Sequence, residues 1–325
     1  MPRTKITPNP PPPRVHYKAF YPWAPDELLI ECTSLTTAED VENHLGELRL
    51  YNFNAFCKTH DSHISIRHGT PREPVCVDDR SNGGKPFFFF YQAVFKRIGL
   101  RLPFTTFERE LLTEVNVVPA QLHPNGWAFV RAFQILCGYL GIPPSVDVFL
   151  HFFEVKKQGK SLWVSFFGVA GRILLTLFQN SFKGWKGLFF RVCANKRNPT
   201  ALDGFPLYWT EKPKPVKPKS LDELSSPDRG VCEALAGPKI VCSSSKLIAC
   251  EFNARTLSSY FGRETRPLLA FSLFIFFNRA FSDSRMQCLS ALISTLVKVC
   301  KAYYRSVVSS SGCLKHQTPG LAIHT

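Results

Sequence analysis

Residues 86–144 read PFFFFYQAVFKRIGLRLPFTTFERELLTEVNVVPAQLHPNGWAFVRAFQILCGYLGIPP, and this segment contains the clearest secondary-structure signals of the chain. Its first part, Phe87 to Ile98, is apolar on nearly every face, which predicts a buried helix. The helix is the favoured interpretation, although Phe87 to Tyr91 alone could instead form a core strand. Gly99 follows at the position where a helix C-cap is expected.

Capping signals and prolines predict the next helix. Thr105 and Glu108 have the spacing of a capping box, in which a threonine and a glutamate satisfy each other's backbone N–H groups. Phe107, Leu111 and Val115 then recur on one helical face. The helix is expected to stop before Pro119.

A polar turn, QLHPNGW at residues 121–127, leads into a third helix. Either Asn125 or Gly126 is expected to cap this helix, and Gly141 is expected to end it. His123 stands beside a proline, which favours a turn residue over a catalytic base.

A fourth helix is expected after Ser145, and two strands follow it. Ser161 to Phe167 (SLWVSFF) and Leu188 to Cys193 (LFFRVC) are rich in aromatic and β-branched residues. The predicted fold class is therefore α+β, mainly α. It comprises a helical module with a small antiparallel strand pair, flanked by a disordered N-terminal tail and a poorly ordered C-terminal region.

Basic and aromatic residues interleave just before the second strand. Such a pattern suits a surface on which bases stack and phosphates bind. An alternative is that the aromatic residues belong to the core and the basic ones form a solvated rim, since a strand alternates its faces. The nucleic-acid candidates are Lys183, Trp185, Lys186 and Arg191.

The N-terminal third is divided at about residue 35. Residues 1–35 are expected to form a disordered, proline-rich tail, because proline fixes φ and lacks a backbone donor. Residues 36–84 are expected to hold a short helix, capped by Thr36 with Glu39, and then loop and strand.

Soft ligands cluster in the same region, as zinc sites require. Cys57 and His60 have a finger-like spacing, and His63, His68 and Cys76 follow them. The second half lacks a tight ligand pair, so ordinary loop histidines are the favoured interpretation and no metal is expected. Cys57, His60, His63 and Cys76 remain weak candidates.

Residues 85–212 are predicted to form the core module, and the sequence TEKPKPVKPK, residues 210–219, marks its boundary. Residues 213–265 are expected to be linker and loop. Residues 266–325 are expected to be an apolar helical remnant with a disordered end. LLAFSLFIFF, residues 268–277, is too short to span a membrane as a helix, which needs about 20 residues.

Positive charge is concentrated in the module and beyond it. Residues 1–84 hold 9 Lys and Arg against 11 Asp and Glu, residues 85–212 hold 16 against 7, and residues 213–325 hold 15 against 7. A basic surface attracts polyanions, chiefly DNA or RNA, or an anionic membrane. The N-terminus lacks the apolar segment of a secretory signal. We therefore expect an intracellular protein, nuclear or cytoplasmic and not secreted, with reduced cysteines.

The sequence contains none of the common enzyme signatures. There is no phosphate-binding loop, nucleophile elbow, HExxH zinc motif or dinucleotide fingerprint. Convergent carboxylates could in principle bind two metal ions, but a solvated helix surface explains them equally well. The carboxylates concerned are Glu108, Glu110, Glu114, Asp147 and Glu154.

Several ordered motifs resemble the plant "putative gypsy-type transposon" domain, a gag-like region of retrotransposon-derived proteins. They are GLRLPF at 99–104, VPAQLHPN at 118–125, WAFVRAF at 127–133 and GYLGI at 138–142. The likeness extends more weakly over about residues 36–212. It implies a transposable-element origin and no catalytic residues. Beyond residue 220 the chain departs from its relatives, which usually continue into polar, coiled-coil-prone sequence.

These observations favour a non-enzymatic, retrotransposon-derived protein with a gag-like role in assembly or nucleic-acid binding. The expected partners are DNA or RNA and further copies of the chain, with no cofactor. One alternative is a metal-dependent enzyme of the transposase or nuclease type. Another is a nonfunctional relic of a transposon.

Overall fold

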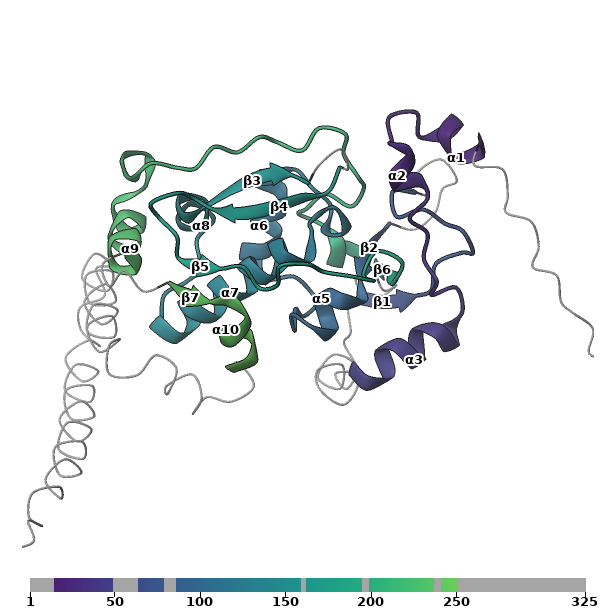
Figure 1. Cartoon of the computed structure of the whole chain (residues 1–325), viewed down its shortest axis with the longest axis horizontal. Helices are drawn as coiled ribbons and strands as arrows, with labels where there is room; N and C mark the ends of the chain where they lie inside the picture. The colour runs from purple at the N-terminus through teal and green to yellow at the C-terminus, as the bar shows by residue number, and fades with distance from the viewer. Residues whose placement is uncertain are drawn as a thin grey trace, which may run out of the picture. The chain divides into compact units, whose positions relative to one another are not determined.

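The computed structural model describes residues 15–48, 64–78, 86–158, 162–194, 199–236 and 241–250 (Figure 1). All of them belong to the first of the chain's two compact units, residues 1–272. The apolar C-terminal segment at 268–277 and the candidate ligands Cys57, His60 and His63 lie outside the described residues.

A three-stranded antiparallel sheet packs against the aromatic core of the module. Its order is β1 (Ile64–Arg67), β6 (Phe189–Ala194) and β2 (Phe87–Tyr91). Every residue of β2 is buried, so its run of aromatics has no polar face. The prediction of a helix from Phe87 is therefore wrong for Phe87–Tyr91, where the strand alternative is confirmed. The helix begins only afterwards, as α5 (Gln92–Lys96).

Two smaller sheets complete the strands. β3 (Phe153–Lys157) pairs antiparallel with β4 (Val164–Gly168), and β5 (Leu175–Thr176) pairs parallel with β7 (Cys242–Ser243). Both strands predicted after Ser161 exist, as β4 and β6, but the prediction of a single strand pair is wrong. Each lies in a different sheet, because its partner comes from another part of the chain. The fold is mixed, with helices and several small sheets.

The predicted helices α6 (Thr106–Val115), α7 (Pro124–Leu140) and α8 (Val146–Phe152) are present. Thr105 and Glu108 make both hydrogen bonds of the predicted capping box. Ser145 caps α8, and Gly141 ends α7 with a φ of 65°.

The N-cap of α7 differs from the expectation. His123 occupies it, ahead of Asn125 and Gly126, and its Nδ1 accepts a hydrogen bond from the Asn125 N–H at 3.1 Å. Pro124 takes the first helical position, where its missing N–H costs nothing.

Aromatic rings fill the core between the sheet and α7. Phe104 lies in a leucine- and proline-flanked turn and stacks on Trp127 with ring centroids 5.4 Å apart. It also stacks on Phe88 of β2 at 5.5 Å. Trp127 is 1% exposed, and its Nε1–H donates to the Pro119 carbonyl at 3.1 Å. Many of the 29 phenylalanines of the chain lie in this core, where each ring buries a large apolar surface.

Residues 15–35 differ from the sequence-based expectation of a disordered tail. They form α1 (Val15–Phe20) and α2 (Asp26–Leu29), and Ala24, Leu28 and Leu35 are fully buried. The prolines dominate only the part before residue 15, and the apolar residues that follow supply enough buried surface to order the segment.

The helix α3 (Ala38–Leu48) follows the N-terminal segment. Its cap is shifted by one residue from the predicted pair Thr36 and Glu39. The Asp40 N–H donates to Thr37 Oγ1 at 3.0 Å, and the Asp40 carboxylate accepts from the Thr37 N–H at 2.9 Å. These hydrogen bonds hold the pKa of the Asp40 carboxyl below its usual value.

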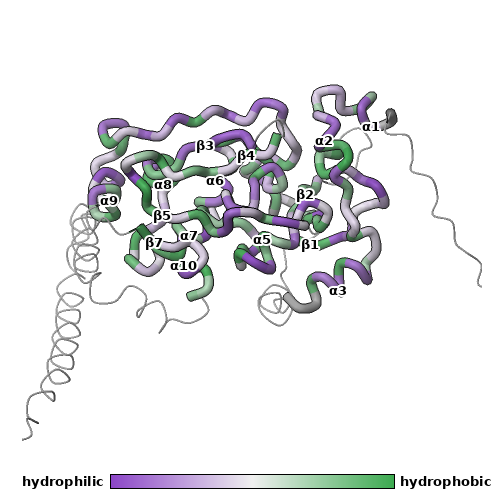
Figure 2. The backbone as a smooth tube through the Cα atoms, viewed as in Figure 1, coloured by the Kyte–Doolittle hydropathy of each residue, from purple (hydrophilic) through white to green (hydrophobic). Residues whose placement is uncertain are grey.

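The segment 210–219, here called the strap, packs along the module in extended form (Figure 1). The Lys214 N–H donates to the Val115 carbonyl at 3.0 Å, and the Lys219 N–H donates to the Leu150 carbonyl at 3.1 Å. Although much of the strap is hydrophilic (Figure 2), its backbone is therefore tied to the ends of α6 and α8. It leads to the 3-10 turn Leu221–Glu223 and then to α9 (Ser226–Ala236).

The chain after the strap packs on the module as well. α9 contacts α8, and α10 (Ser244–Cys250) contacts α7. Short 3-10 turns at Pro119–Gln121 and Pro199–Leu202 complete the described elements. Among the residues described, no helix combines the length and the hydropathy needed to cross a membrane.

Candidate nucleic-acid interface

The segment between β5 and β6, residues 177–188, carries the basic and aromatic side chains singled out in the sequence. Phe178 stacks on Phe182 with ring centroids 5.8 Å apart and planes 17° from parallel. The Asn125 side chain donates to the Gln179 carbonyl at 2.8 Å, which ties the segment to the start of α7. Gly184 has a φ of +67°, a conformation that favours glycine, so the chain turns sharply here.

An open hollow of about 510 Å³ lies against this segment. One wall comes from the N-terminal segment and the rest from the chain leading into β6. The Ser34 N–H donates to the Gly187 carbonyl at 2.9 Å, and the Thr33 hydroxyl donates to the Phe189 carbonyl at 2.5 Å. The lining residues are Glu31, Ser34, Phe182, Gly184, Trp185, Lys186, Gly187 and Leu188.

Three of the four predicted nucleic-acid residues gather at this hollow. Trp185 and Lys186 line it, and Lys183 stands between two lining residues with its side chain exposed. Lys186 Nζ lies 2.9 Å from Glu31 Oε1 and 4.5 Å from the centroid of the Trp163 ring. Lys183 has no ion-pair partner in the part of the chain that the structure describes.

Arg191 lies elsewhere, on β6. Its guanidinium forms an ion pair with Glu73, which is 3% exposed at its side chain, and packs 4.5 Å from the Phe87 ring centroid. This arginine therefore balances a buried carboxylate and holds β6 to the 70–76 loop. A buried pair of this kind is costly to break, because either partner alone would be an uncompensated buried charge.

Trp185 is 5% exposed and forms much of the floor of the hollow. Its ring makes edge contacts with Tyr91, Trp163 and His123 at centroid distances of 4.5, 5.8 and 5.2 Å. Trp163 donates through Nε1 to the Tyr91 hydroxyl at 3.1 Å. These contacts leave only a small part of Trp185 open to the hollow.

His123 lies behind the floor and stays neutral. Burial, with the nearby Lys186 ammonium as a second cause, lowers the pKa of His123 to about 4. Its Nδ1 accepts from the Asn125 N–H, and its ring meets Phe182 as well as Trp185 edge to face. The interpretation of His123 as a residue that shapes the turn agrees with these contacts.

Arg97 is a further basic residue at this surface that sequence reasoning missed. Its guanidinium lies 4.4 Å from the Phe182 ring centroid, and it donates a hydrogen bond to the Gln179 side chain. Arg97 follows α5, 85 positions before Phe182 in the sequence. No local pattern could have joined the two.

The turn at Gln121 has a structural task. Gln121 is fully buried, and its side-chain N–H groups donate to the Leu162 carbonyl at 3.0 Å and the Thr210 carbonyl at 2.7 Å. Its Oε1 accepts from the Thr210 N–H at 3.3 Å. The motif that carries the family likeness therefore fastens the start of the strap to the module.

The carboxylates considered for a two-metal site lie in separate places. Lys214 pairs with Glu114 at 2.6 Å, Lys219 pairs with Asp147 at 2.5 Å, and Lys156 pairs with Glu154. Glu108 is buried in its capping box, and burial raises the pKa of its carboxyl. Across the described ranges, no three His, Cys, Asp or Glu side chains come together as metal ligands would.

The described members of the zinc candidates do not form a site. Cys76 is 2% exposed, and burial raises the pKa of its thiol to about 12. His68 is exposed and donates through Nδ1 to the Gly69 carbonyl at 2.8 Å.

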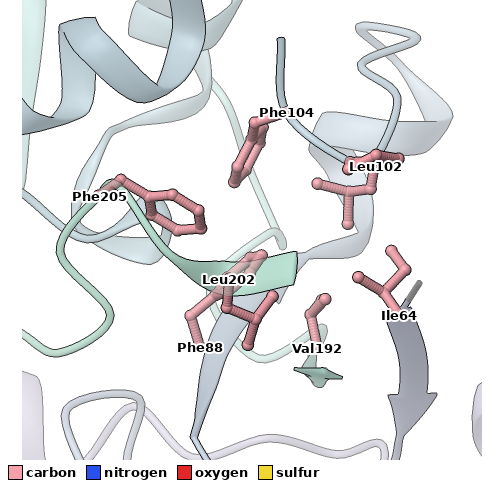
Figure 3. Close-up of a pocket in the computed structure, with 8 residues that line it drawn as sticks. Ile64, Phe88, Leu102, Phe104, Val192, Leu202 and Phe205 are labelled. Atoms are coloured by element: carbon pink, nitrogen blue, oxygen red, sulfur yellow. The ribbon is translucent and has the colours of Figure 1, made fainter. Parts of the chain in front are cut away.

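A second, much smaller pocket lies between the three-stranded sheet and the turn before α6 (Figure 3). It encloses about 10 Å³ and is lined by apolar side chains, among them Phe88, Phe104 and Phe205. This volume is about the minimum that one water molecule needs, and the side chains that line the pocket are all apolar, so the pocket is a packing gap.

Comparison with known families gives one match. Residues 89–157 match the family described as "Putative gypsy type transposon". The resemblance read from the sequence is thereby confirmed for this segment. No curated protein and no solved structure matches the chain. The strands that pair with β2 and β3 lie after residue 157, so the folded unit extends beyond the matched segment.

Proposed function

We propose that this chain, whose residues 89–157 form a gypsy-type transposon domain, is a non-enzymatic, gag-like protein that binds nucleic acid. The observation that carries the proposal is the charge of residues 162–194, which hold Arg172, Lys183, Lys186 and Arg191 and no Asp or Glu.

The acidic side chains lie in other parts of the chain, and many are already engaged. Glu31, Glu73, Glu114, Asp147 and Glu154 each pair with a lysine or arginine. The positive charge of residues 162–194 favours a polyanion, whose condensed counterions are released on binding. The same engagement of the carboxylates argues against the metal-dependent nuclease alternative.

The test is a binding titration of the full-length chain with a labelled 20-nucleotide strand of mixed sequence, followed by fluorescence anisotropy. At 50 mM salt we expect a Kd of about 10⁻⁶ M or tighter, weakening by at least about tenfold at 200 mM salt, as counterion release requires. No anisotropy change at 50 mM salt and 100 µM protein would reject the proposal.

Self-association, the other expectation drawn from the resemblance, stays a prediction. Sedimentation of the chain at micromolar concentration, with and without the 20-nucleotide strand, measures it directly. A nucleic-acid-dependent increase in mass beyond one chain per strand would indicate assembly.

A further inference from the structure

The hollow between the N-terminal segment and residues 182–188 has the size of a small-ligand site. Its volume of about 510 Å³ lies within the range of about 300 to 1,000 Å³ typical of such sites. Two aromatic side chains, Phe182 and Trp185, form part of its lining. Aromatic floors of this kind accept any nucleobase by stacking, because every base has a π face.

Cations are placed around these two rings. Lys186 lines the hollow, Lys183 is exposed between two lining residues, and Arg97 covers Phe182 at 4.4 Å. A base held against the rings would therefore bring its own phosphate within the reach of lysine side chains. This is the combination found in sites for single-stranded nucleic acid.

Glu31 competes with a phosphate for the same lysine. Its carboxylate pairs with the Lys186 ammonium at 2.9 Å, while the two side chains remain 24% and 40% exposed, respectively. An ion pair with this exposure is worth only about 0 to 1 kcal/mol, so a phosphate can displace it. The backbone of the Glu31 segment stays fixed, because Ser34 and Thr33 bind Gly187 and Phe189.

We propose that this hollow seats one unpaired nucleotide of a single strand, with the base against Phe182 and Trp185 and a phosphate at Lys183 and Lys186. Glu31 holds Lys186 when the hollow is empty and limits the affinity when it is filled. This assignment rests on the proposed nucleic-acid function and gives it a location and a substrate class.

The recessed position of the rings sets the preference for an unpaired base. Phe182 is 9% exposed and Trp185 is 5% exposed, so only a small part of each ring faces the hollow and a ligand must enter it to make contact. A base within a duplex would first have to leave its stack and its partner, which costs a few kcal/mol. Single strands should therefore bind more tightly than the same sequence as a duplex.

The first experiment compares Lys183→Ala with Lys217→Ala in the full-length chain. Both remove one exposed lysine that has no ion-pair partner among the described residues, but Lys217 lies on the strap. Loss of one phosphate contact to a single strand should weaken binding about eightfold at 50 mM salt and reduce the salt slope by about 0.7. Lys217→Ala should weaken it less than about twofold.

The second experiment compares Glu31→Gln with Glu27→Gln, a matched loss of one negative charge on the adjacent α2. Glu27 is exposed and forms no ion pair in the described structure. We expect Glu31→Gln to tighten single-strand binding by about two- to fivefold, because it frees Lys186 from a surface ion pair. Glu27→Gln should leave the affinity within about 1.5-fold.

The outcomes separate this inference from the proposed function. Three results together support the nucleotide seat. The affinity for a single strand is at least threefold higher than for the duplex. Of each matched pair, only Lys183→Ala weakens binding and only Glu31→Gln tightens it. Equal affinity for single strand and duplex, or equal effects of the two variants in each matched pair, overturns the nucleotide seat. The proposed nucleic-acid binding would still stand. Absence of any binding by the wild-type chain overturns both.

Discussion

His123 shows how a residue that looks catalytic can serve the fold. Its Nδ1 caps α7 through the Asn125 N–H, and its ring supports the two aromatic side chains that line the hollow. These tasks require a neutral imidazole, because a protonated Nδ1 could not accept the hydrogen bond. Burial supplies that neutrality by lowering the pKa to about 4.

The depressed pKa of His123 makes stability fall in mild acid. The unfolded chain binds a proton near pH 6.5 and the folded chain only near pH 4, so the free energy of unfolding rises with pH between these values. This one group should cost about 2 kcal/mol of stability between pH 7 and pH 5. Urea denaturation at the two pH values measures it.

His123→Asn tests the assignment, since asparagine also caps helices but does not titrate. The variant should lose most of the difference between pH 7 and pH 5. A smaller dependence of the same sign should remain, because burial also lowers the pKa of His151. If the variant and the wild type lose the same stability on acidification, His123 is not the titrating group.

Among the elements, the strap departs most from what its composition suggests. Prolines and lysines are typical of a solvated linker, yet prolines also suit an extended segment that needs few backbone donors. The partners that fix the strap are distant in sequence. Gln121 holds Thr210, while His151 Nδ1 and the Arg172 guanidinium donate to the Lys219 carbonyl.

Hydrogen exchange distinguishes a packed strap from a linker. The amides of Lys214 and Lys219 donate to Val115 and Leu150, whereas that of Lys217 makes no backbone hydrogen bond within the described structure. Residue-resolved exchange should therefore be slower at Lys214 and Lys219 than at Lys217 by at least about tenfold. Equally fast exchange at all three amides would show that the segment is a free linker.

Helix ends could be predicted from the sequence because their determinants are local. The capping box at Thr105 and the stop at Gly141 each depend on a few adjacent residues. Strand pairing could not be predicted from the sequence, because β6 pairs with β2 across about a hundred positions, with Phe89 opposite Arg191. For the same reason Lys183, Trp185 and Lys186 were found as a group, while Glu31 and Arg97 were not.

At the scale of the whole molecule, ion pairs connect the acidic N-terminal part and the strap to the basic module. Carboxylates from the acidic N-terminal part, Glu31 and Glu73, pair with basic residues of the module. Lysines of the strap pair with carboxylates of the module in turn. These pairs tie distant segments together, and residues 162–194, which contain no Asp or Glu, supply the surface that we propose for a polyanion.

Photochemical crosslinking locates that surface most directly. A single strand containing 4-thiouridine would be irradiated with the full-length chain at 50 mM salt, and the crosslinked residues identified by mass spectrometry after digestion. We expect crosslinks to concentrate on residues 182–188, chiefly at Phe182 and Trp185, and to diminish when unlabelled strand competes. Competable crosslinks that fall instead on the strap or α9, with none at 182–188, would contradict it.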